Sequence, residues 1–564
     1  MKVVIVGGVA GGASAAARLR RLNEDAQIII FERSGYISYA NCGLPYYIGG
    51  VIKNKEELTL QTPESFWSRF RIDTRVKTEV VSINSEKMTV SVHDLKTDKY
   101  YEESYDKLVL APGAVAIKPD LPGIDNDKIV ILRTVEDTLR IRDIVTNENI
   151  KSVVVIGGGY VGVEAAENLK EIGIDVTIVD KQNQVLGQLD EDMVSFVHSH
   201  LKAKGIKLVL GNGVQGFESN DNGVNVKLDN HPSINADIVL LSIGVVPDSK
   251  LAKEAGLELS VRNSIAVNDH MQTSDKNIYA VGDAVSILNA VTNQLSTISL
   301  AGPANKQGRI AADNIAGLDS CYKGSVASSV LKVFDVTVAT TGINERIAKA
   351  NGIDCEKIII SPASHASYYP GGTVMTIKFL FDKVNERIIG AQIVGFDGVD
   401  KRIDVIATAM QAGMKATELK DLDLSYAPPY SSAKDPVNML GFVAENVMTG
   451  KVKHFYYEDI ENLINDTNAI LLDTRTVWEY NNGHAKGFET HIPVDNLRER
   501  LGEMDKSKKI YVMCQSGLRS YIACRLLSQE GFDCYNFAGG YRFYKSVSEN
   551  SFDEKCSTDC GMIK

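Results

Sequence analysis

The sequence predicts an α/β protein with two nucleotide-binding folds, followed by an α+β domain and a smaller α/β domain. A strand, a glycine-rich turn and a helix fill residues 3–22, and a second apolar strand follows at residues 27–31. The same order returns at residues 152–180, which is a repeat at the scale of a domain. Beyond Tyr322 the glycine turns give way to strand-like runs at residues 329–340, 373–381 and 388–394, a helix over residues 401–412 and a last α/β pattern.

Composition restricts the class of protein. The chain has 564 residues, too many for one core, and its net charge of -11 argues against sequence-independent nucleic-acid binding. No apolar run reaches the length of about 18–20 residues that spans a bilayer, and the apolar N-terminus is better explained by a strand and phosphate-binding turn than by a signal peptide. Eight cysteines spread through a long chain favour free thiols in a reducing cytoplasm. We therefore expect a cytoplasmic protein that binds neither membranes nor nucleic acid.

The second glycine turn fits the dinucleotide-binding motif. Gly157, Gly159 and Gly162 follow a strand and open a helix, so that the backbone can approach a pyrophosphate at the helix N-terminus. Asp180 ends the next strand, where a carboxylate accepts hydrogen bonds from a ribose hydroxyl and repels a 2′-phosphate. The turn predicts an NAD(P)H site with a mild preference for NADH.

The first glycine turn departs from this motif, since Val9 stands where the middle glycine is expected. By itself the turn leaves a structural role and a nucleotide site equally open. Glu32 ends the following strand, at the distance where an acid can hold an adenosine ribose. The segments at residues 110–113 and 278–284 resemble the Ala-x-Gly turn and the Gly-Asp strand end that close the FAD site of flavin-disulfide reductases. In this order, the four elements predict bound FAD.

A single cysteine lies just past the second strand of this first fold. Cys42 has no second cysteine about five residues away, as an intramolecular redox disulfide would require, and the next one is Cys321. It can therefore cycle with an external sulfur as a mixed disulfide, or as a sulfenic acid. A buried inert thiol is the alternative, disfavoured by the small polar residues around Cys42 and by its place in the segment expected beside the flavin.

Residues 38–46 (Ser-Tyr-Ala-Asn-Cys-Gly-Leu-Pro-Tyr), 300–309 and 365–371 strongly resemble the coenzyme A-disulfide reductase family, and the resemblance covers about residues 1–450. It implies a mixed disulfide between Cys42 and coenzyme A, beside Ser38 and Asn41. It also implies a homodimer in which Tyr368 and Tyr426 reach the partner's reacting sulfur. Basic residues are expected to hold the coenzyme A phosphates, or else to be solvated surface charges; they are Arg18, Arg21, Arg71, Lys306 and Arg309.

A second candidate thiol lies near the C-terminus. Cys514 follows an apolar strand, and the loop from Cys514 to Arg519 opens a helix, so backbone N–H groups can surround a thiolate or persulfide. Together with residues 471–484, this loop closely resembles a rhodanese active site, which implies that Cys514 carries sulfane sulfur with Arg519 beside it. A phosphatase is the competing interpretation; the six-residue loop favours sulfur over the larger phosphate, as the resemblance implies. The role of Cys556 and Cys560 in the C-terminal tail stays open.

These expectations give six segments: a FAD-binding domain in two parts, an NAD(P)H-binding domain, an α+β dimerisation domain, a rhodanese domain and a tail. In chain order they span residues 1–115 (FAD), 116–245 (NAD(P)H), 246–322 (FAD), 323–450 (dimerisation), 455–550 (rhodanese) and 551–564 (tail). The expected catalytic residues are Cys42, Tyr368, Tyr426, Cys514 and Arg519. The residues expected to bind FAD, NAD(P)H or coenzyme A are Gly7, Gly8, Gly12, Glu32, Arg33, Ser38, Asn41, Ala111, Gly113, Gly157, Gly159, Gly162, Asp180, Gly244, Gly282, Asp283, Lys306 and Arg309. No metal site is predicted.

The expected function is reduction of coenzyme A persulfide, polysulfide or coenzyme A disulfide by NAD(P)H, through FAD and Cys42, while Cys514 handles sulfane sulfur. Because the chain is fused to a sulfurtransferase domain, persulfides or polysulfides are favoured over plain disulfides as the substrate. Two alternatives stay open: an NADH oxidase or peroxidase that uses a Cys42 sulfenic acid, and a flavin-based redox sensor. The sequence does not decide which sulfur substrate is used, whether NADH or NADPH is preferred, or whether Cys514 passes sulfur to Cys42 directly.

Overall fold

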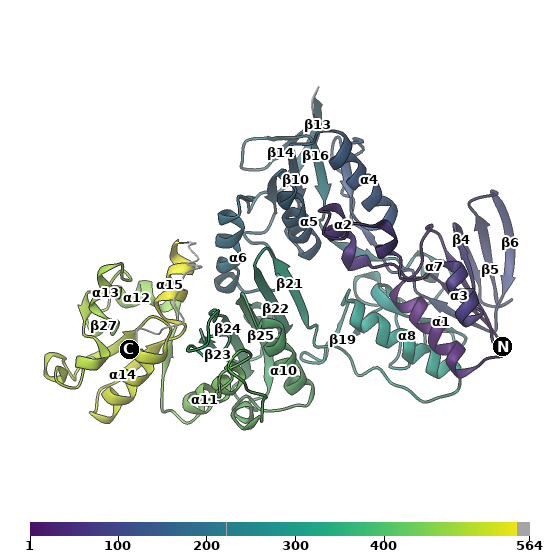
Figure 1. Ribbon diagram of the computed structural model, residues 1–564. Helices are drawn as coiled ribbons and strands as arrows, with labels where there is room; N and C mark the ends of the chain where they lie inside the picture. The colour runs from purple at the N-terminus through teal and green to yellow at the C-terminus, as the bar shows by residue number, and fades with distance from the viewer. Residues whose placement is uncertain (221–222, 550–564) are drawn as a thin grey trace. The chain divides into compact units, whose positions relative to one another are not determined.

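A computed structural model describes residues 1–220 and 223–549 of the chain (Figure 1). The chain forms two compact units. One holds Met1–Val185 and Gly205–Ala327, and the other holds Leu186–Lys204 and the described residues from Ser328 onward. Both units mix helices with sheets, which confirms the predicted α/β class. In the described residues, no helix is both long and apolar enough to cross a membrane.

The first nucleotide-binding fold is a five-stranded parallel sheet in the order β18-β7-β1-β2-β3. Its N-terminal part is β1 (Lys2–Val6), α1 (Ala10–Leu22) and β2 (Gln27–Glu32). Strands β1 and β2 are almost wholly buried, as expected for inner strands of a parallel sheet covered on both faces. The other three strands are β3 (Asp73–Val76), β7 (Lys107–Leu110) and β18 (Ile278–Ala280). Because β18 pairs with β7, the sheet joins two distant stretches of the chain.

The second nucleotide-binding fold repeats this arrangement in the order β12-β11-β10-β16-β9, and again all the strands are parallel. It is made of β9 (Ile129–Ile131), β10 (Ser152–Ile156), α5 (Tyr160–Glu171), β11 (Asp175–Val179), β12 (Lys207–Val209) and β16 (Ile238–Leu241). Helix α4 (Val135–Asn147) precedes β10. The repeat seen in the sequence is therefore a repeat of structure.

Two three-stranded antiparallel sheets in the first unit were not predicted. One contains β4 (Thr78–Asn84), β5 (Thr89–Asp94) and β6 (Lys99–Ser104). The other contains β13 (Val214–Asn220), β14 (Gly223–Leu228) and β15 (Ile234–Ala236). Many of their strand positions alternate between buried and exposed, and such short alternating runs give a weaker signal than the fully apolar parallel strands.

The second unit begins with an antiparallel sheet in the order β21-β22-β25-β24-β23. The strands are β21 (Ser329–Val333), β22 (Val336–Gly342), β23 (Cys355–Ile360), β24 (Thr376–Asp382) and β25 (Ile388–Gly395), and the helices are α10 (Val399–Gln411) and α11 (Pro436–Met448). The single strand expected over residues 329–340 was wrong. It is a hairpin that turns at Phe334, whose φ of 53° lies in the left-handed region.

The C-terminal part of the second unit has a parallel sheet in the order β26-β30-β29-β27-β28, with the two short edge strands β26 (His454–Phe455) and β28 (Thr490–His491). The elements that matter for the site are β27 (Ala469–Asp473), α13 (Val477–Asn481), β29 (Lys509–Met513), α14 (Leu518–Gln529), β30 (Cys534–Phe537) and α15 (Gly540–Glu549). Strand β29 ends directly before Cys514, and α14 begins four residues after that cysteine, as the sequence predicts.

Several polar contacts fasten this C-terminal part to the rest of its unit. The Tyr456 hydroxyl donates to Glu356 Oε1 at 2.7 Å, and Lys357 forms an ion pair with Glu458. On α6 (Glu191–Ala203), Ser195 Oγ lies 2.9 Å from Ser546 Oγ of α15. Most of these groups are buried or half-buried, so the contacts favour one fixed placement within the unit.

Candidate functional site

The two glycine turns have the same backbone geometry. Gly7 and Gly157 have φ values of 97° and 102°, which L side chains rarely adopt. A Cβ on Gly12 would lie 1.9 Å from the Gly7 carbonyl oxygen, and a Cβ on Gly162 would lie 2.0 Å from that of Gly157. The first and last glycines of each turn are thus required for packing a helix directly on a strand end, whatever the turn binds.

The two glycine turns differ in the residue at their middle position. A Cβ on Gly159 would meet no protein atom within 4 Å, so packing within the protein does not require glycine there. A pyrophosphate that approaches the backbone does require it. In the first turn Val9 occupies this position at a negative φ of -101°. The departure from the motif is therefore compatible with the fold of the turn.

An acid holds each turn in the same way. Gly8 donates its N–H to Glu32 Oε2 at 2.9 Å, and Gly158 donates its N–H to Asp180 Oδ2 at 2.7 Å. Ser34 and Gln182 donate their N–H groups to the other carboxylate oxygen of the respective acid. Each carboxylate oxygen keeps a further acceptor position, so the acids can also receive ribose hydroxyls.

The other predicted FAD-site elements gather around the first turn. A Cβ on Gly7 would lie 2.1 Å from Ala111 O, so the Ala111–Gly113 turn packs against the glycine turn. Gly282 has a φ of 83° and donates its N–H to Gln307 Oε1 of α8 (Ala301–Ile315) at 2.7 Å. Gly113 also has a positive φ, of 75°. Gly244, expected in the second fold, has a φ of 106° shortly after β16.

Arg133 belongs to this region and was missed by sequence reasoning. It lies 3.4 Å from the Asp283 carboxylate and donates from Nε to Ala114 O at 3.0 Å. Burial raises the pKa of Asp283, and the nearby Arg133 guanidinium opposes that rise. Residues 133 and 283 are far apart in the chain, so no local pattern links them. Arg133 therefore joins the Asp283 end of the site to the 111–114 turn.

Cys42 lies in a short 3₁₀ turn, Asn41–Gly43, that leads into α2 (Leu44–Ile48). The residue is exposed, yet desolvation and the carboxylates of Glu164 and Asp283 raise the pKa of its thiol. Ser38 has a φ of 43° and donates its N–H to Gly8 O at 2.8 Å, which ties the cysteine segment to the glycine turn. The predicted neighbours of Cys42 are thus held beside the first fold by backbone contacts.

Glu164 was not predicted, although it lies one helical turn after Tyr160 in the second glycine motif. The Tyr46 hydroxyl donates to Glu164 Oε1 at 3.3 Å, which links α2 to α5. Burial and the nearby Glu167 raise the pKa of Glu164 to about 7, although the Tyr46 hydrogen bond opposes this. The carboxyl therefore titrates near neutral pH, close enough to Cys42 to affect its charge.

Tyr368 and Tyr426 meet in the second unit. Their hydroxyl oxygens lie 2.5 Å apart, and the side chains are 70% and 46% exposed. This hydrogen bond raises the pKa of Tyr368. Arg402 is buried beneath the two loops: it donates to Ser364 O at 2.9 Å and pairs with Asp435 at 3.0 Å. It thereby fastens together the segments that carry the two tyrosines.

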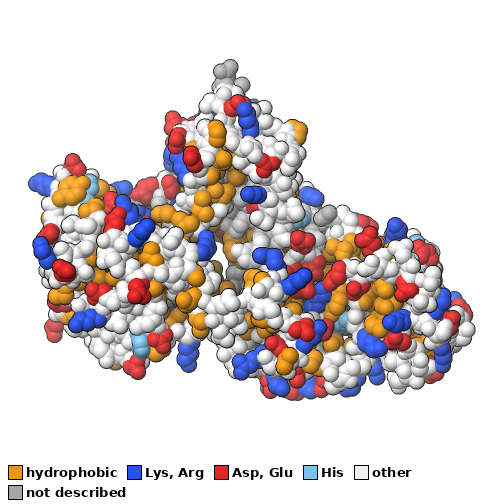
Figure 2. Space-filling model, turned by 180° about the vertical axis from the view of Figure 1, so that it is seen from behind, with side chains coloured by type: hydrophobic (Ala, Val, Ile, Leu, Met, Phe, Trp, Pro, Cys, Tyr) orange, Lys and Arg blue, Asp and Glu red, His pale blue; other side chains and the backbone are white. Residues whose placement is uncertain are grey.

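Of the five predicted phosphate-binding residues, Arg18 and Arg21 lie on α1, and Lys306 and Arg309 lie on α8, which packs against α1 (Figure 1). Arg71 directly follows the helix Pro63–Phe70. Lys306 and Arg309 are exposed on α8. Arg18 is less available than the sequence suggests, since its Nε donates to Asp313 Oδ1 at 2.6 Å. Arg33 is exposed and pairs with Asp248 at 3.2 Å. On the face shown in Figure 2, acidic and basic side chains are interspersed.

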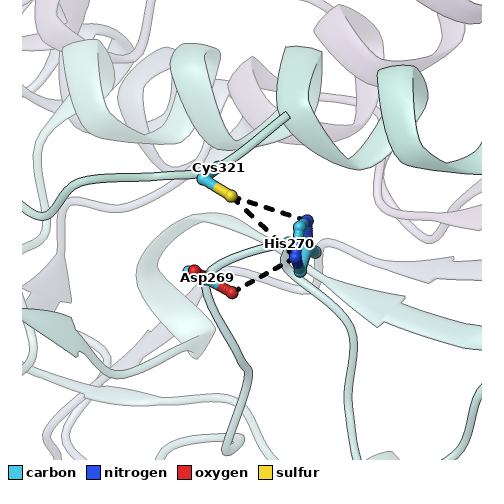
Figure 3. Close-up of side chains that lie close together, drawn as sticks. All are labelled: Asp269, His270 and Cys321. Carbon is cyan, nitrogen blue, oxygen red and sulfur yellow. Dashed lines mark hydrogen bonds and ion pairs between the residues drawn. The ribbon is translucent and has the colours of Figure 1, made fainter. Parts of the chain in front are cut away.

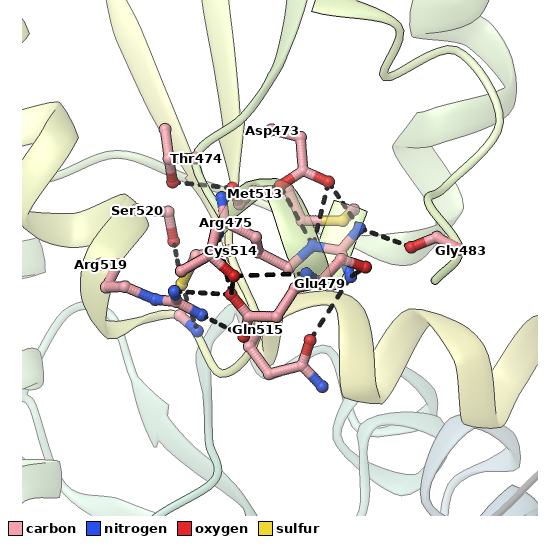
Figure 4. A network of polar contacts seen from close by, with 12 residues as sticks. Asp473, Thr474, Arg475, Glu479, Gly483, Met513, Cys514, Gln515, Arg519 and Ser520 are labelled. Carbon is pink, nitrogen blue, oxygen red and sulfur yellow. Dashed lines mark hydrogen bonds and ion pairs between the residues drawn. The ribbon is translucent and has the colours of Figure 1, made fainter. Parts of the chain in front are cut away.

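In the second unit, the Cys514 loop surrounds a fully buried sulfur (Figure 4). Gly517 N–H and Ser520 Oγ each lie 3.2 Å from Cys514 Sγ and can donate to a thiolate. From the other side, Tyr541 N–H donates to Cys514 O at 2.7 Å. A Cβ on Gly540 would come within 2.6 Å of the Gln515 backbone, so the start of α15 closes tightly over the loop.

Two arginines frame this loop (Figure 4). Arg519 forms a two-bond ion pair with Glu479 of α13, at 2.7 and 2.8 Å. Although burial acts to raise it, the hydrogen bonds from Arg519 and Thr476 hold the pKa of Glu479 below its ordinary value. Arg475 is wholly buried against Asp473, at 2.7 Å. Sequence reasoning identified Arg519 as a site residue but gave no role to Glu479, which orients it.

The remaining cysteines differ from these two. Cys524 and Cys534 are buried, and Cys534 donates to the Cys524 carbonyl oxygen at 3.2 Å, which fits a structural role. Cys556 and Cys560 lie outside the described residues.

Comparison with protein families divides the chain into three matched stretches. The model of the pyridine nucleotide-disulphide oxidoreductase family matches residues 1–308, and that of its dimerisation domain matches residues 328–436. The rhodanese-like domain model matches residues 457–546. The matches include both glycine turns and Cys42, both tyrosines, and the Cys514 loop.

Individual proteins match longer stretches of the chain than the separate family models do. A coenzyme A disulfide reductase of Staphylococcus aureus (strain JH9) is 36% identical over 445 residues, which cover 79% of this chain and all of the relative. The crystal structure of reduced Bacillus anthracis CoADR-RHD is 48% identical, with a TM-score of 0.95 over 97% of this chain and 98% of that one. A NAD-dependent persulfide reductase from A. fulgidus is 36% identical, with a TM-score of 0.90 over 96% of this chain and all of that one.

Proposed function

The chain belongs to the pyridine nucleotide-disulphide oxidoreductase family and carries a rhodanese-like domain, and from that premise we propose that it reduces coenzyme A persulfide or disulfide with NADH. The observation that carries the proposal is the pairing of two sulfur sites in one chain. One is a single exposed cysteine beside a flavin-type fold, and the other is a buried cysteine in a loop of N–H and O–H donors. The relatives named for coenzyme A disulfide and for persulfide support this substrate class.

The first fold fits FAD, and the second fits NADH. Glu32 would hold the adenosine ribose, Asp283 with Arg133 would face the ribityl chain, and Asp180 would hold the NADH ribose. Bound FAD would relay two electrons from NADH to a disulfide on Cys42. We propose that Lys306 and Arg309 bind the phosphates of coenzyme A and that the protein is a homodimer, for which the matched dimerisation domain is the support.

Cys42 is the proposed nucleophile. Its thiolate attacks the coenzyme A sulfur of a persulfide, a Cys42–coenzyme A disulfide forms and hydrosulfide leaves. With coenzyme A disulfide, a coenzyme A thiolate leaves instead. Two electrons from NADH then break the mixed disulfide, which yields two thiolates, NAD⁺ and a proton. The Tyr368–Tyr426 pair of the partner subunit would donate a hydrogen bond to the departing sulfur.

Cys514 is the proposed sulfur carrier. Its thiolate takes sulfane sulfur from a donor such as thiosulfate, with loss of sulfite, and holds it as a persulfide. Gly517 N–H and Ser520 Oγ stabilise the negative sulfur. Attack by coenzyme A thiolate would then move the outer sulfur and produce the persulfide that Cys42 reduces.

Trapping the Cys42 adduct tests the proposal. The protein is incubated with coenzyme A disulfide without NADH, and its peptides are analysed by mass spectrometry. We expect one coenzyme A on the peptide that carries Cys42, and its release on addition of NADH. A protein that oxidises NADH with this substrate but never carries coenzyme A on Cys42 would contradict the mechanism.

Equivalent substitutions in the two glycine turns should affect different cofactors. Gly12→Ala places a Cβ 1.9 Å from Gly7 O, so we expect bound FAD to fall at least about tenfold, measured by flavin absorbance. Gly162→Ala creates the equivalent clash in the second fold and is expected to keep its flavin. Its flavin should require at least about tenfold more NADH for reduction. Loss of flavin from both variants alike would refute the assignment of the two folds.

The charge of Glu164 is expected to make the ionisation of the Cys42 thiol depend on the protonation of this carboxyl. A neutral Glu164 removes a negative charge near the sulfur, so proton uptake by this carboxyl, with its pKa of about 7, favours the Cys42 thiolate. Glu164→Gln removes that charge at every pH. We expect faster alkylation of Cys42 above neutral pH and a lower apparent pKa, measured on the Cys42 peptide by mass spectrometry.

Tyr46→Phe is the matched control for this substitution. It removes the hydroxyl that donates to Glu164 but keeps the carboxyl itself, so Cys42 should keep its raised pKa at high pH, where the carboxyl is charged. Alkylation of Cys42 with the same pH profile in Glu164→Gln and the wild type would show that the carboxylate does not influence the thiol.

A further inference from the structure

Asp269, His270 and Cys321 form a compact group of side chains on the first unit, apart from the residues assigned above (Figure 3). One potential ligand atom from each residue lies within 4.8 Å of those from the other two. His270 Nε2 is 3.5 Å from Asp269 Oδ1 and 3.9 Å from Cys321 Sγ. Fifty-one positions separate His270 from Cys321 in the chain, so the fold brings them together.

The backbone holds both segments in place. Tyr322 donates its N–H to Asp269 O at 2.7 Å, directly beside the group. The Asn314 side-chain amide, near the end of α8, donates to His270 O at 3.3 Å and to Ser320 O at 2.7 Å. The loop before β18 and the segment after α8 are therefore fastened together, and the three side chains meet on a fixed base.

The histidine is oriented as in many metal sites. His270 Nδ1 lies 3.1 Å from the Ser320 carbonyl oxygen, which can only accept, so Nδ1 carries the proton in this contact. The neutral imidazole then has its lone pair on Nε2, the ring nitrogen that lies 3.5 Å from Asp269 Oδ1. Cys321 Sγ lies beside the ring, 3.9 Å from Nε2 and 3.8 Å from Nδ1 (Figure 3), so a small rotation of the exposed cysteine side chain would be needed for it to share an ion with Nε2. A backbone carbonyl on the opposite ring nitrogen is a common outer contact of metal-bound histidines.

The spacing suits a tetrahedral zinc ion. With ordinary zinc bond lengths, a nitrogen ligand lies about 3.4 Å from an oxygen ligand and about 3.6 Å from a sulfur ligand. The corresponding separations here, 3.5 and 3.9 Å, come close to this arrangement. Asp269 and Cys321 are exposed, so their side chains can adjust and water can take the fourth position. Asp319, at 3.6 Å from His270 Nδ1, adds negative charge.

We propose that Asp269, His270 and Cys321 form a surface site for a divalent cation with the ligand preference of Zn²⁺. Thiolate, imidazole and carboxylate together match zinc better than magnesium or calcium, which take oxygen ligands. A bound ion would link the segment after α8 to the loop before β18, and so would stabilise this part of the first unit. It has no part in the reduction of sulfur substrates.

Zinc titration of the flavin-loaded protein tests this site. The probe is Zn²⁺ alone, and its binding is measured by calorimetry for the wild type, Cys321→Ser and His270→Gln. Cys355→Ser is the matched control, because Cys355 is a partly exposed thiol outside the group. We expect the wild type and Cys355→Ser to bind one equivalent of zinc more than Cys321→Ser and His270→Gln do. Equal stoichiometry and affinity in all four proteins would overturn the proposal.

Protection of the thiol gives an independent readout. Zinc should slow alkylation of Cys321 by at least about tenfold in the wild type, since only the free thiolate reacts. Alkylation of Cys355 in the same sample should not change. In His270→Gln the protection of Cys321 should largely disappear. Unchanged alkylation of Cys321 in saturating zinc would contradict the site, even if zinc binds elsewhere on the protein.

Discussion

Cys42→Ser is expected to lower kcat for NADH-dependent reduction of coenzyme A disulfide by about 10⁴-fold or more, the scale of loss when a covalent nucleophile is removed. A serine hydroxyl stays protonated at neutral pH and cannot form the mixed disulfide. The change is small and the position is exposed, so the fold and the bound flavin should be retained. Steady-state oxidation of NADH, with flavin content measured in parallel, checks the prediction.

The Cys514→Ser variant is the control for this experiment. Cys514→Ser should reduce coenzyme A disulfide at the wild-type rate, because Cys514 takes no part in that step. If instead Cys42→Ser retains substantial disulfide reduction, the single-cysteine mechanism is wrong. Strong oxygen-dependent NADH oxidation by the wild type without any sulfur substrate, lost in Cys42→Ser, would support the oxidase interpretation.

Cys514→Ser is expected to lower sulfur transfer from thiosulfate to cyanide by about 10³-fold or more. Its thiol is the group in this loop that can carry sulfane sulfur, and the donors from Gly517 and Ser520 both point at it. Ser520→Ala removes one of these donors, and we expect a loss of about tenfold, corresponding to one charge-assisted hydrogen bond. The rate of thiocyanate formation measures both effects.

Ser528→Ala is the matched control for that series. Ser528 lies on the same helix, α14, and its hydroxyl donates to Arg525 O rather than to the sulfur. Sulfur transfer by this variant should equal that of the wild type. Loss of activity in Ser528→Ala as large as in Ser520→Ala would mean that general damage to α14, not the missing donor, explains the result.

The sequence predicted those parts of the site that are local in the chain. Gly157, Gly162 and Asp180 lie within one strand-turn-helix-strand unit, where spacing alone determines which groups meet. The Cys514 loop is equally local, between β29 and α14. Such segments carry their geometry in a few residues, and the structure has the predicted turns at these positions.

Residues that depend on tertiary packing could not be predicted in this way. Arg133, Glu164 and Glu479 reach the sites from other elements, and no spacing links them to the site residues that they contact or influence. The zinc site proposed here has the same origin, because its histidine and cysteine lie on different segments, and the sequence indicated no metal site. The hairpin at Phe334 was missed because one apolar run covers both of its strands.

The most direct test of the central proposal compares coenzyme A persulfide with coenzyme A disulfide as substrates for NADH oxidation, in the wild type, Cys42→Ser and Cys514→Ser. We predict a higher kcat/KM for the persulfide, loss of both activities in Cys42→Ser, and retention of both in Cys514→Ser, which confines Cys514 to sulfur delivery. Poor turnover of both substrates by the wild type, with oxygen-dependent oxidation intact in Cys42→Ser, would contradict the proposed function.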